Sequence, residues 1–225
     1  MTPTRLWRIA GALLITYIVM AFAGFALQRS VVLGDSPENG RAALVDSSMA
    51  QTFTGGYVEY LGVLVFLVAA ALLARLLRGA GPLADWLSSC ITAAAVTFVS
   101  VTLATGLAAG AAALYHGHHS GSLQLITTVN DIRNFAFFLS IGVEGVLALA
   151  VAGAIVVTRA LPRWLAWAGF AVGTLCIVGV AGAAWGVHDY VGMLWFVWLL
   201  ALGVAALRGP RQPTADVPDR LAVRA

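Results

Sequence analysis

Residues 132–157 read IRNFAFFLSIGVEGVLALAVAGAIVV, an apolar run that contains only two charged residues, Arg133 and Glu144. A helix needs about 20 predominantly apolar residues to cross the roughly 30 Å hydrocarbon core of a bilayer, and this run is long enough. We therefore interpret it as a membrane-spanning helix. The composition of the whole chain should then be that of a membrane protein.

The composition agrees. Of the 225 residues, 60% are hydrophobic and only 10% are charged, whereas soluble domains carry about 25% charged residues. Too little polar side-chain material is present to cover a soluble globule of this size. The chain is therefore expected to be all-α and polytopic, with the lipid bilayer as its surroundings, and its composition excludes disordered, collagen-like and disulfide-rich secreted proteins.

Six apolar runs are long enough to span the membrane, and they predict a bundle of six transmembrane helices within residues 1–208. The longest break between the runs is the loop 28–56, and the proline-rich end of the chain, 209–225, is expected to be a disordered tail. The expected spans are 7–27, 57–77, 86–114, 132–157, 164–185 and 190–207.

The arginines predict the orientation of the bundle. All 13 basic residues are Arg, and with alternating spans only Arg29, Arg41 and Arg133 fall on the side opposite the termini. Because cytoplasmic segments carry an excess of basic residues, both termini are expected in the cytoplasm. An Arg-only, Ala- and Gly-rich composition is typical of a GC-rich bacterial genome, which suggests the inner (plasma) membrane of a bacterium. The arginines are dispersed at the ends of the runs rather than gathered on one face, which argues against nucleic-acid binding.

Glu144 lies about 15 Å into its span, near the bilayer centre. A carboxylate costs roughly 2.5–3.5 kcal/mol there, so we expect it to face the bundle interior. The hydroxyls expected at the same level are those of Tyr17, Ser100 and Thr102. Two hypotheses remain open: a ligand or proton site on a transport path, or a hydrogen-bonded acid that fixes helix register.

A second polar cluster is expected at the outer surface, where all four histidines fall. Imidazoles with carboxylates in reach can hold a divalent metal. Haem is disfavoured because no histidine lies deep in a span. The alternative is a set of solvated histidines. The candidate metal ligands are His116, His118, His119, His188 and Asp189, and Glu59, Asp131 and Arg133 complete an outward polar vestibule.

Small-residue spacings indicate which helices pack closely. Gly106-xxx-Gly110 in the third span and Gly169-xxx-Gly173 in the fifth allow close approach of a neighbouring helix. The third and fifth spans are therefore expected in the interior of the bundle.

The layout resembles that of a family of uncharacterised bacterial multi-pass integral membrane proteins, of the domain-of-unknown-function type. The resemblance rests on Arg8-Ile-Ala-Gly11, on the stretch from Arg29 to Asp35, and on Leu161-Pro-Arg-Trp-Leu-Ala-Trp-Ala-Gly169. It implies a six-span helical bundle and no particular activity.

Three functions remain open from the sequence. The first is a small transporter or ligand-binding bundle with an outward vestibule above Glu144. The second is a non-catalytic subunit or regulatory partner of another membrane protein, or a homo-oligomer. The third is a metal-dependent membrane enzyme that uses the outer histidines. Nucleotide-binding and common hydrolase motifs are absent from the sequence, so ATP-driven pumping by this chain alone is unsupported.

Overall fold

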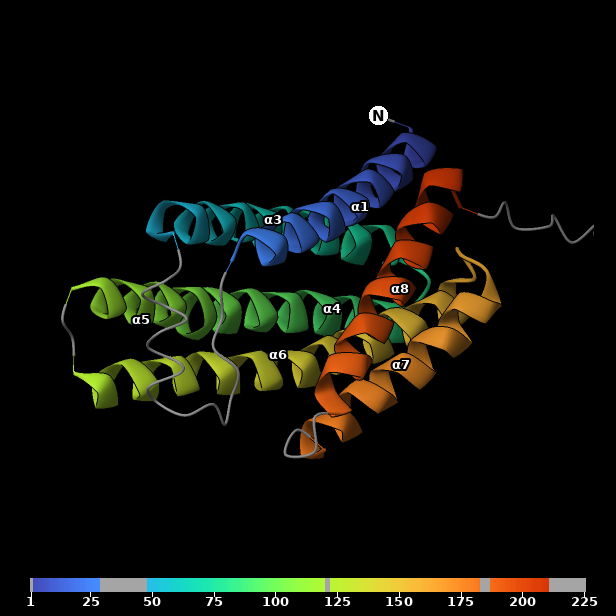
Figure 1. Cartoon of the computed structure of the whole chain (residues 1–225). Coiled ribbons are helices and arrows are strands. Elements are labelled where there is room, and N and C mark those ends of the chain that lie inside the picture. Colours follow the sequence, from blue (N-terminus) through green and yellow to red (C-terminus); the bar gives the residue numbers. More distant parts are fainter. Residues whose placement is uncertain (1, 29–47, 120–121, 183–186, 211–225) are drawn as a thin grey trace, which may run out of the picture.

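The computed structural model describes residues 2–28, 48–119, 122–182 and 187–210, with the side chains of 187–189 excepted. Within this part the protein is all-helical, and six of its helices are long and apolar enough to cross a membrane. They pack into one bundle (Figure 1). The expected all-α, multi-span architecture is confirmed.

The helices follow one another up and down the bundle. The third span is built from three consecutive segments, α4, η1 and α5, of which η1 is a π-helix. The bounds are α1 Pro3–Leu27, α3 Met49–Leu76, α4 Pro82–Val101, η1 Thr102–Leu107, α5 Ala108–His118, α6 Leu123–Thr158, α7 Arg163–Ala181 and α8 Val187–Arg208.

The two ends of the bundle differ in charge. At one end, which we call the arginine end, α1 begins and α8 ends, and a Cβ on Gly209 would lie 3.2 Å from Cγ2 of Thr4. Arg75 and Arg208 occupy the last turns of their helices at this end. The opposite end, which we call the loop end, carries the end of α1, the start of α3, the end of α5 and the start of α6 (Figure 1).

At the loop end the helices are longer than the apolar runs indicate. α3 begins at Met49 rather than near residue 57, and α6 begins at Leu123 rather than at 132. The hydroxyls of Ser48 and Ser122 each accept a hydrogen bond from a backbone N–H of the first turn, which caps the two helices. The loop expected over 28–56 therefore ends before residue 49.

A small apolar cluster holds these extensions together. Ala113, Leu114 and Ile126 are buried against one another, and Met49 and Val129 pack on them. This cluster is separate from the main core. Tertiary packing thus keeps the relatively polar helix starts helical beyond the apolar runs.

α6 is the most extensively buried of the six spans. Against α7 the two backbones touch at glycines: a Cβ on Gly145 would lie 2.7 Å from the carbonyl oxygen of Gly173. A Cβ on Gly169 would lie 3.0 Å from the Trp198 ring, so the Gly169-xxx-Gly173 face packs as expected. The Gly106-xxx-Gly110 face of the third span, in contrast, does not pack closely on another helix, so that expectation was wrong. A Cβ on Gly106 would meet nothing closer than 3.9 Å, and a Cβ on Gly110 would meet the side chain of Arg133.

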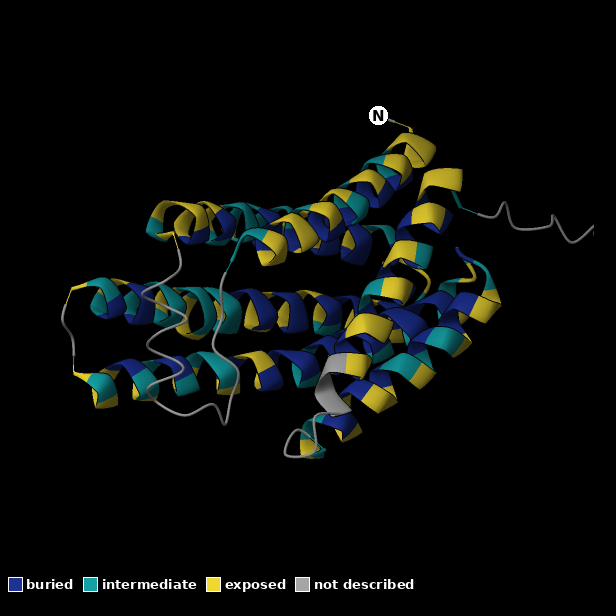
Figure 2. Cartoon of the chain, viewed as in Figure 1, coloured by how far each residue is buried: buried dark blue, intermediate teal, exposed yellow. Residues whose placement is uncertain are grey.

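The outer surface of the bundle suits a lipid environment. Exposed residues lie around it (Figure 2). Many of them are large and apolar, including Val19, Val68 and Val178. Trp86 and Trp167 are exposed near the arginine end of their helices, as interfacial anchors are. Trp195 lies fully buried in the core.

Candidate functional site

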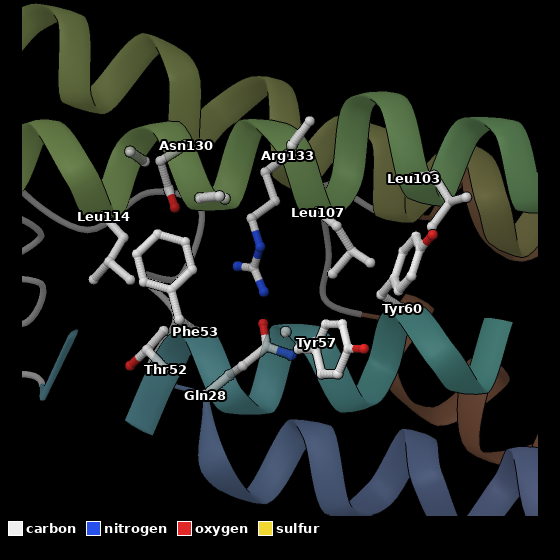
Figure 3. A pocket seen from close by; sticks show the side chains of 15 residues that line it. Gln28, Thr52, Phe53, Tyr57, Tyr60, Leu103, Leu107, Leu114, Asn130 and Arg133 are labelled. Carbon is white, nitrogen blue, oxygen red and sulfur yellow. The ribbon is translucent and has the colours of Figure 1, made fainter. Parts of the chain in front are cut away.

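A cavity of about 360 Å³ lies near the loop end, between α3 on one side and η1, α5 and the first half of α6 on the other (Figure 3). Most of its wall is apolar, with a few polar groups among the aliphatic and aromatic ones. Its lining residues are Gln28, Thr52, Phe53, Gly56, Tyr57, Tyr60, Leu103, Leu107, Ala108, Gly110, Ala111, Ala113, Leu114, Asn130 and Arg133.

Arg133 provides the charged side chain among the lining residues. It comes from α6, passes across α5 and points toward α3, as Figure 3 shows. Gly110 makes this path available, because a Cβ there would lie 2.9 Å from Cδ and 3.0 Å from Nε of Arg133. The glycine at this position of α5 thus leaves room for the Arg133 side chain to reach the cavity.

Arg133 interacts electrostatically with the carboxylate of Glu59 on α3. The two charges attract each other. Glu59 is half-buried and accepts a hydrogen bond from the side-chain amide of Gln28, with 2.5 Å between Nε2 and Oε2. Within the part of the chain that the structure describes, the hydrogen bond to Glu59 therefore comes from Gln28 and not from Arg133.

The π-helix η1 forms one wall of the cavity. Leu103 and Leu107, both in η1, line it. The wider turn interrupts the i to i−4 ladder of the third span, and such π-bulges occur frequently at functional sites. The hydroxyl of Thr102, the first residue of η1, is buried and has no hydrogen-bond partner among the described residues.

Distances along the helices place the cavity near one membrane boundary. At 1.5 Å per residue, Tyr60 is about 22 Å from Arg75 along α3, and Arg133 is about 39 Å from Arg159 along α6. If the arginine end marks one boundary of a core about 30 Å thick, the cavity straddles the other boundary. Its exposed Tyr57 and Tyr60 then lie where interfacial aromatic residues are enriched.

Glu144 lies deeper and does not line the cavity. Its side chain is only 6% exposed, and no hydrogen bond to its carboxylate is found among the described residues. Tyr17, itself 4% exposed, lies close enough to Glu144 and Glu59 to interact electrostatically with both. Tyr17 also packs on Phe66, with ring centroids 4.7 Å apart. The structure thus brings Tyr17 near the two acids, within an aromatic part of the core.

The other residues expected at the level of Glu144 lie in the third span. Ser100 is exposed on the outer surface of α4, and Thr102 is half-buried in η1. Asp131 is half-buried in α6, eight residues past the helix start, and is not among the cavity-lining residues. Among the described residues of the expected vestibule, Arg133 lines the cavity and Glu59 does not.

The three histidines whose side chains the structure describes do not form a metal site among themselves. His116 and His118 lie in α5 and His119 directly follows it, where its Nδ1 is 2.9 Å from the carbonyl oxygen of Tyr115. Among the described residues, no three His, Cys, Asp or Glu side chains lie close enough to hold a metal ion. The side chains of His188 and Asp189 lie outside the described residues, so the predicted metal site remains a prediction.

Sequence reasoning missed most of the cavity wall, including Gln28, Tyr57, Leu107 and Asn130. No sequence pattern marks these residues, because they come together only through the packing of α3 and α5. One signal was available: the third apolar run is longer than a bilayer needs and contains glycines. Arg133, a charge near the start of a span, was the other pointer.

Comparison with protein-family models, with curated protein sequences and with solved structures gave no match to this chain. The fold and the cavity are therefore the basis on which a function can be argued.

Proposed function

We propose that this protein is a ligand-binding membrane protein of the bacterial inner membrane, which holds a small, largely apolar molecule in the cavity beside Arg133. The observation that carries the proposal is the cavity of about 360 Å³ itself. Small-molecule sites span about 300–1,000 Å³ and combine apolar walls with a few polar groups. The lining described above fits both criteria.

Ligand access is supported by the exposure of the α3 side of the cavity. Phe53 is 43% exposed and Tyr57 is 61% exposed, and both line the cavity. These rings form a rim that faces outward from the bundle, toward the lipid and the membrane interface. An apolar molecule dissolved in the bilayer can thus reach the cavity without crossing the main core.

The orientation is part of the proposal. The arginine end carries most of the arginines, and the cavity lies at the other end. By the excess of basic residues on cytoplasmic segments, the arginine end faces the cytoplasm together with both termini. The cavity then opens at the outer leaflet of the membrane.

Photolabelling of the full chain in nanodiscs tests the proposal. A neutral alkyl probe, decanol carrying a diazirine, is irradiated with the protein, and labelled residues are mapped by mass spectrometry. We expect labelling of Phe53 and Leu103, which face the cavity from opposite walls.

Two variants make the test specific. Ala111→Phe places a ring inside the cavity and should remove most of this labelling, because the ligand volume is lost. Ala104→Phe adds the same ring at an exposed position of η1 that is outside the cavity, and should leave the labelling unchanged. Equal labelling in wild type and Ala111→Phe would show that the cavity holds no ligand.

A further inference from the structure

We infer that the ligand of this cavity is an amphipathic acid: an apolar chain that ends in a carboxylate or a phosphate, bound at Arg133. This inference rests on the proposed function and specifies the chemical class of its ligand. Three features of the cavity support this ligand class: the charge that faces it, the distribution of polar groups in its wall and its level in the membrane.

The charge that faces the cavity is positive. Arg133 lines the cavity, whereas Glu59, the acid that attracts it, does not. Glu59 accepts a hydrogen bond from Gln28, the C-cap residue of α1, which itself lines the cavity. An arginine in a largely apolar wall favours an anion, and a guanidinium can donate two parallel hydrogen bonds to a carboxylate or phosphate.

The cavity wall is mostly apolar on the side of Arg133 that carries Leu107 and Leu103, whereas Asn130 and Thr52 lie toward the other end. Figure 3 shows the guanidinium between the α5 and α3 ribbons, with Gln28 opposite and Leu103 and Tyr60 toward one end. Thr52 also lines the cavity, and its buried hydroxyl has no partner among the described residues. A ligand with one acidic end and an apolar body matches this division.

The level of Arg133 in the bundle agrees with such a ligand. At about 39 Å along α6 from Arg159, Arg133 lies near the boundary of a 30 Å hydrocarbon core, where the acidic groups of amphiphiles reside. Tyr60 and Leu103 lie deeper, at the level of acyl chains. Free fatty acids and anionic phospholipids share this chemistry, so the experiment must separate these two sources.

Competition against the neutral diazirine probe measures the preference. The full chain in phosphatidylcholine nanodiscs is labelled in the presence of decanoate, decanol or decyltrimethylammonium at matched amounts. A second series replaces part of the lipid with phosphatidylglycerol. We expect decanoate, phosphatidylglycerol or both to displace the probe from Leu103 at concentrations about tenfold or more below those of the cationic analogue. Competition by decanoate identifies a free fatty acid as the ligand, and competition by phosphatidylglycerol identifies an anionic phospholipid.

Variants then assign the preference to Arg133. Arg133→Gln should remove the preference for the acid while the neutral probe still labels the cavity. Gly110→Ala is an independent variant, because its Cβ displaces the flexible Arg133 side chain without removing the charge, and it should weaken acid competition severalfold. Gly106→Ala adds a Cβ in open space one turn away and serves as the matched control.

Three results would overturn the inference: equal competition by the acid and the cation, an acid preference that survives in Arg133→Gln, or no competition by either acid. In each case, labelling that disappears only in Ala111→Phe would leave the ligand-binding proposal intact. If the neutral probe instead labelled wild type and Ala111→Phe equally, the proposed function itself would be contradicted.

Discussion

Gln28, the residue that caps the C-terminal end of α1, donates its side-chain amide to the carboxylate of Glu59 in α3 at 2.5 Å. The two helices touch closely here, since a Cβ on Gly55 would lie 2.9 Å from the carbonyl oxygen of Gly24. The bond satisfies a half-buried acid and keeps it turned toward α1. Arg133, which makes no hydrogen bond to Glu59 among the described residues, lines the cavity together with Gln28.

Gln28→Leu should therefore destabilise the bundle. The substitution leaves the Glu59 carboxylate without its donor, and an unsatisfied buried polar group costs about 1–3 kcal/mol. Thermal unfolding in detergent should show a lower midpoint than wild type. Gln28→Leu combined with Glu59→Leu should recover part of the loss, because neither partner then needs a hydrogen bond. An unchanged midpoint in the single variant would mean that this bond contributes nothing to stability.

The contact between α6 and α7 should not tolerate a side chain. Gly145→Ala places a methyl group 2.7 Å from the Gly173 carbonyl oxygen, so the helices must separate. Overpacking of this kind costs about 1–3 kcal/mol. Gly56→Ala is the matched control, because a Cβ there meets nothing within 4 Å. Equal unfolding midpoints for the two variants would contradict the close contact.

Glu144→Leu should make the protein more stable. The acid is 6% exposed inside a membrane span and no hydrogen bond to it is found among the described residues, so removing it relieves the cost of burying an acid. We expect an unfolding midpoint a few degrees above wild type, and Glu144→Gln between the two. Retention of a destabilising group is typical of a functional position. A large destabilisation by Leu would instead indicate that Glu144 holds the bundle together.

Cysteine labelling tests the proposed orientation. With Cys90 and Cys176 replaced by Ala, single cysteines at Thr4 and Ser122 lie at the arginine end and the loop end, respectively. A membrane-impermeant maleimide added to intact spheroplasts should label Ser122→Cys and leave Thr4→Cys unlabelled until the membrane is opened. The reverse pattern would place both termini outside the cell.

The fold was predictable from sequence because a spanning helix is recognised by its apolar length alone. The helix starts at the loop end were not. Residues 49–56 and 123–130 contain several polar side chains, and they are helical because Ser48 and Ser122 cap them and because Leu114 and Ile126 pack together. Capping and tertiary packing overrode a boundary drawn from hydropathy.

The site was only partly predictable. Arg133 and Glu59 were identifiable as charges in or beside apolar spans, and the structure places them near each other. Their separate roles depend on Gln28 and Gly110, which carry no recognisable signal in the sequence. Gly106-xxx-Gly110 was interpreted as a helix-packing motif, yet Gly110 makes room for a side chain rather than for a helix.

The most direct test of the central claim uses crystals of the full chain grown with 10-bromodecanoate, in which anomalous scattering locates the bromine. The account predicts an anomalous peak inside the cavity, on the Leu103 side of Arg133, that is missing from crystals of Ala111→Phe and retained in Ala104→Phe. Bromine found only along the exposed lipid-facing surface, with none between α3 and η1, would contradict it.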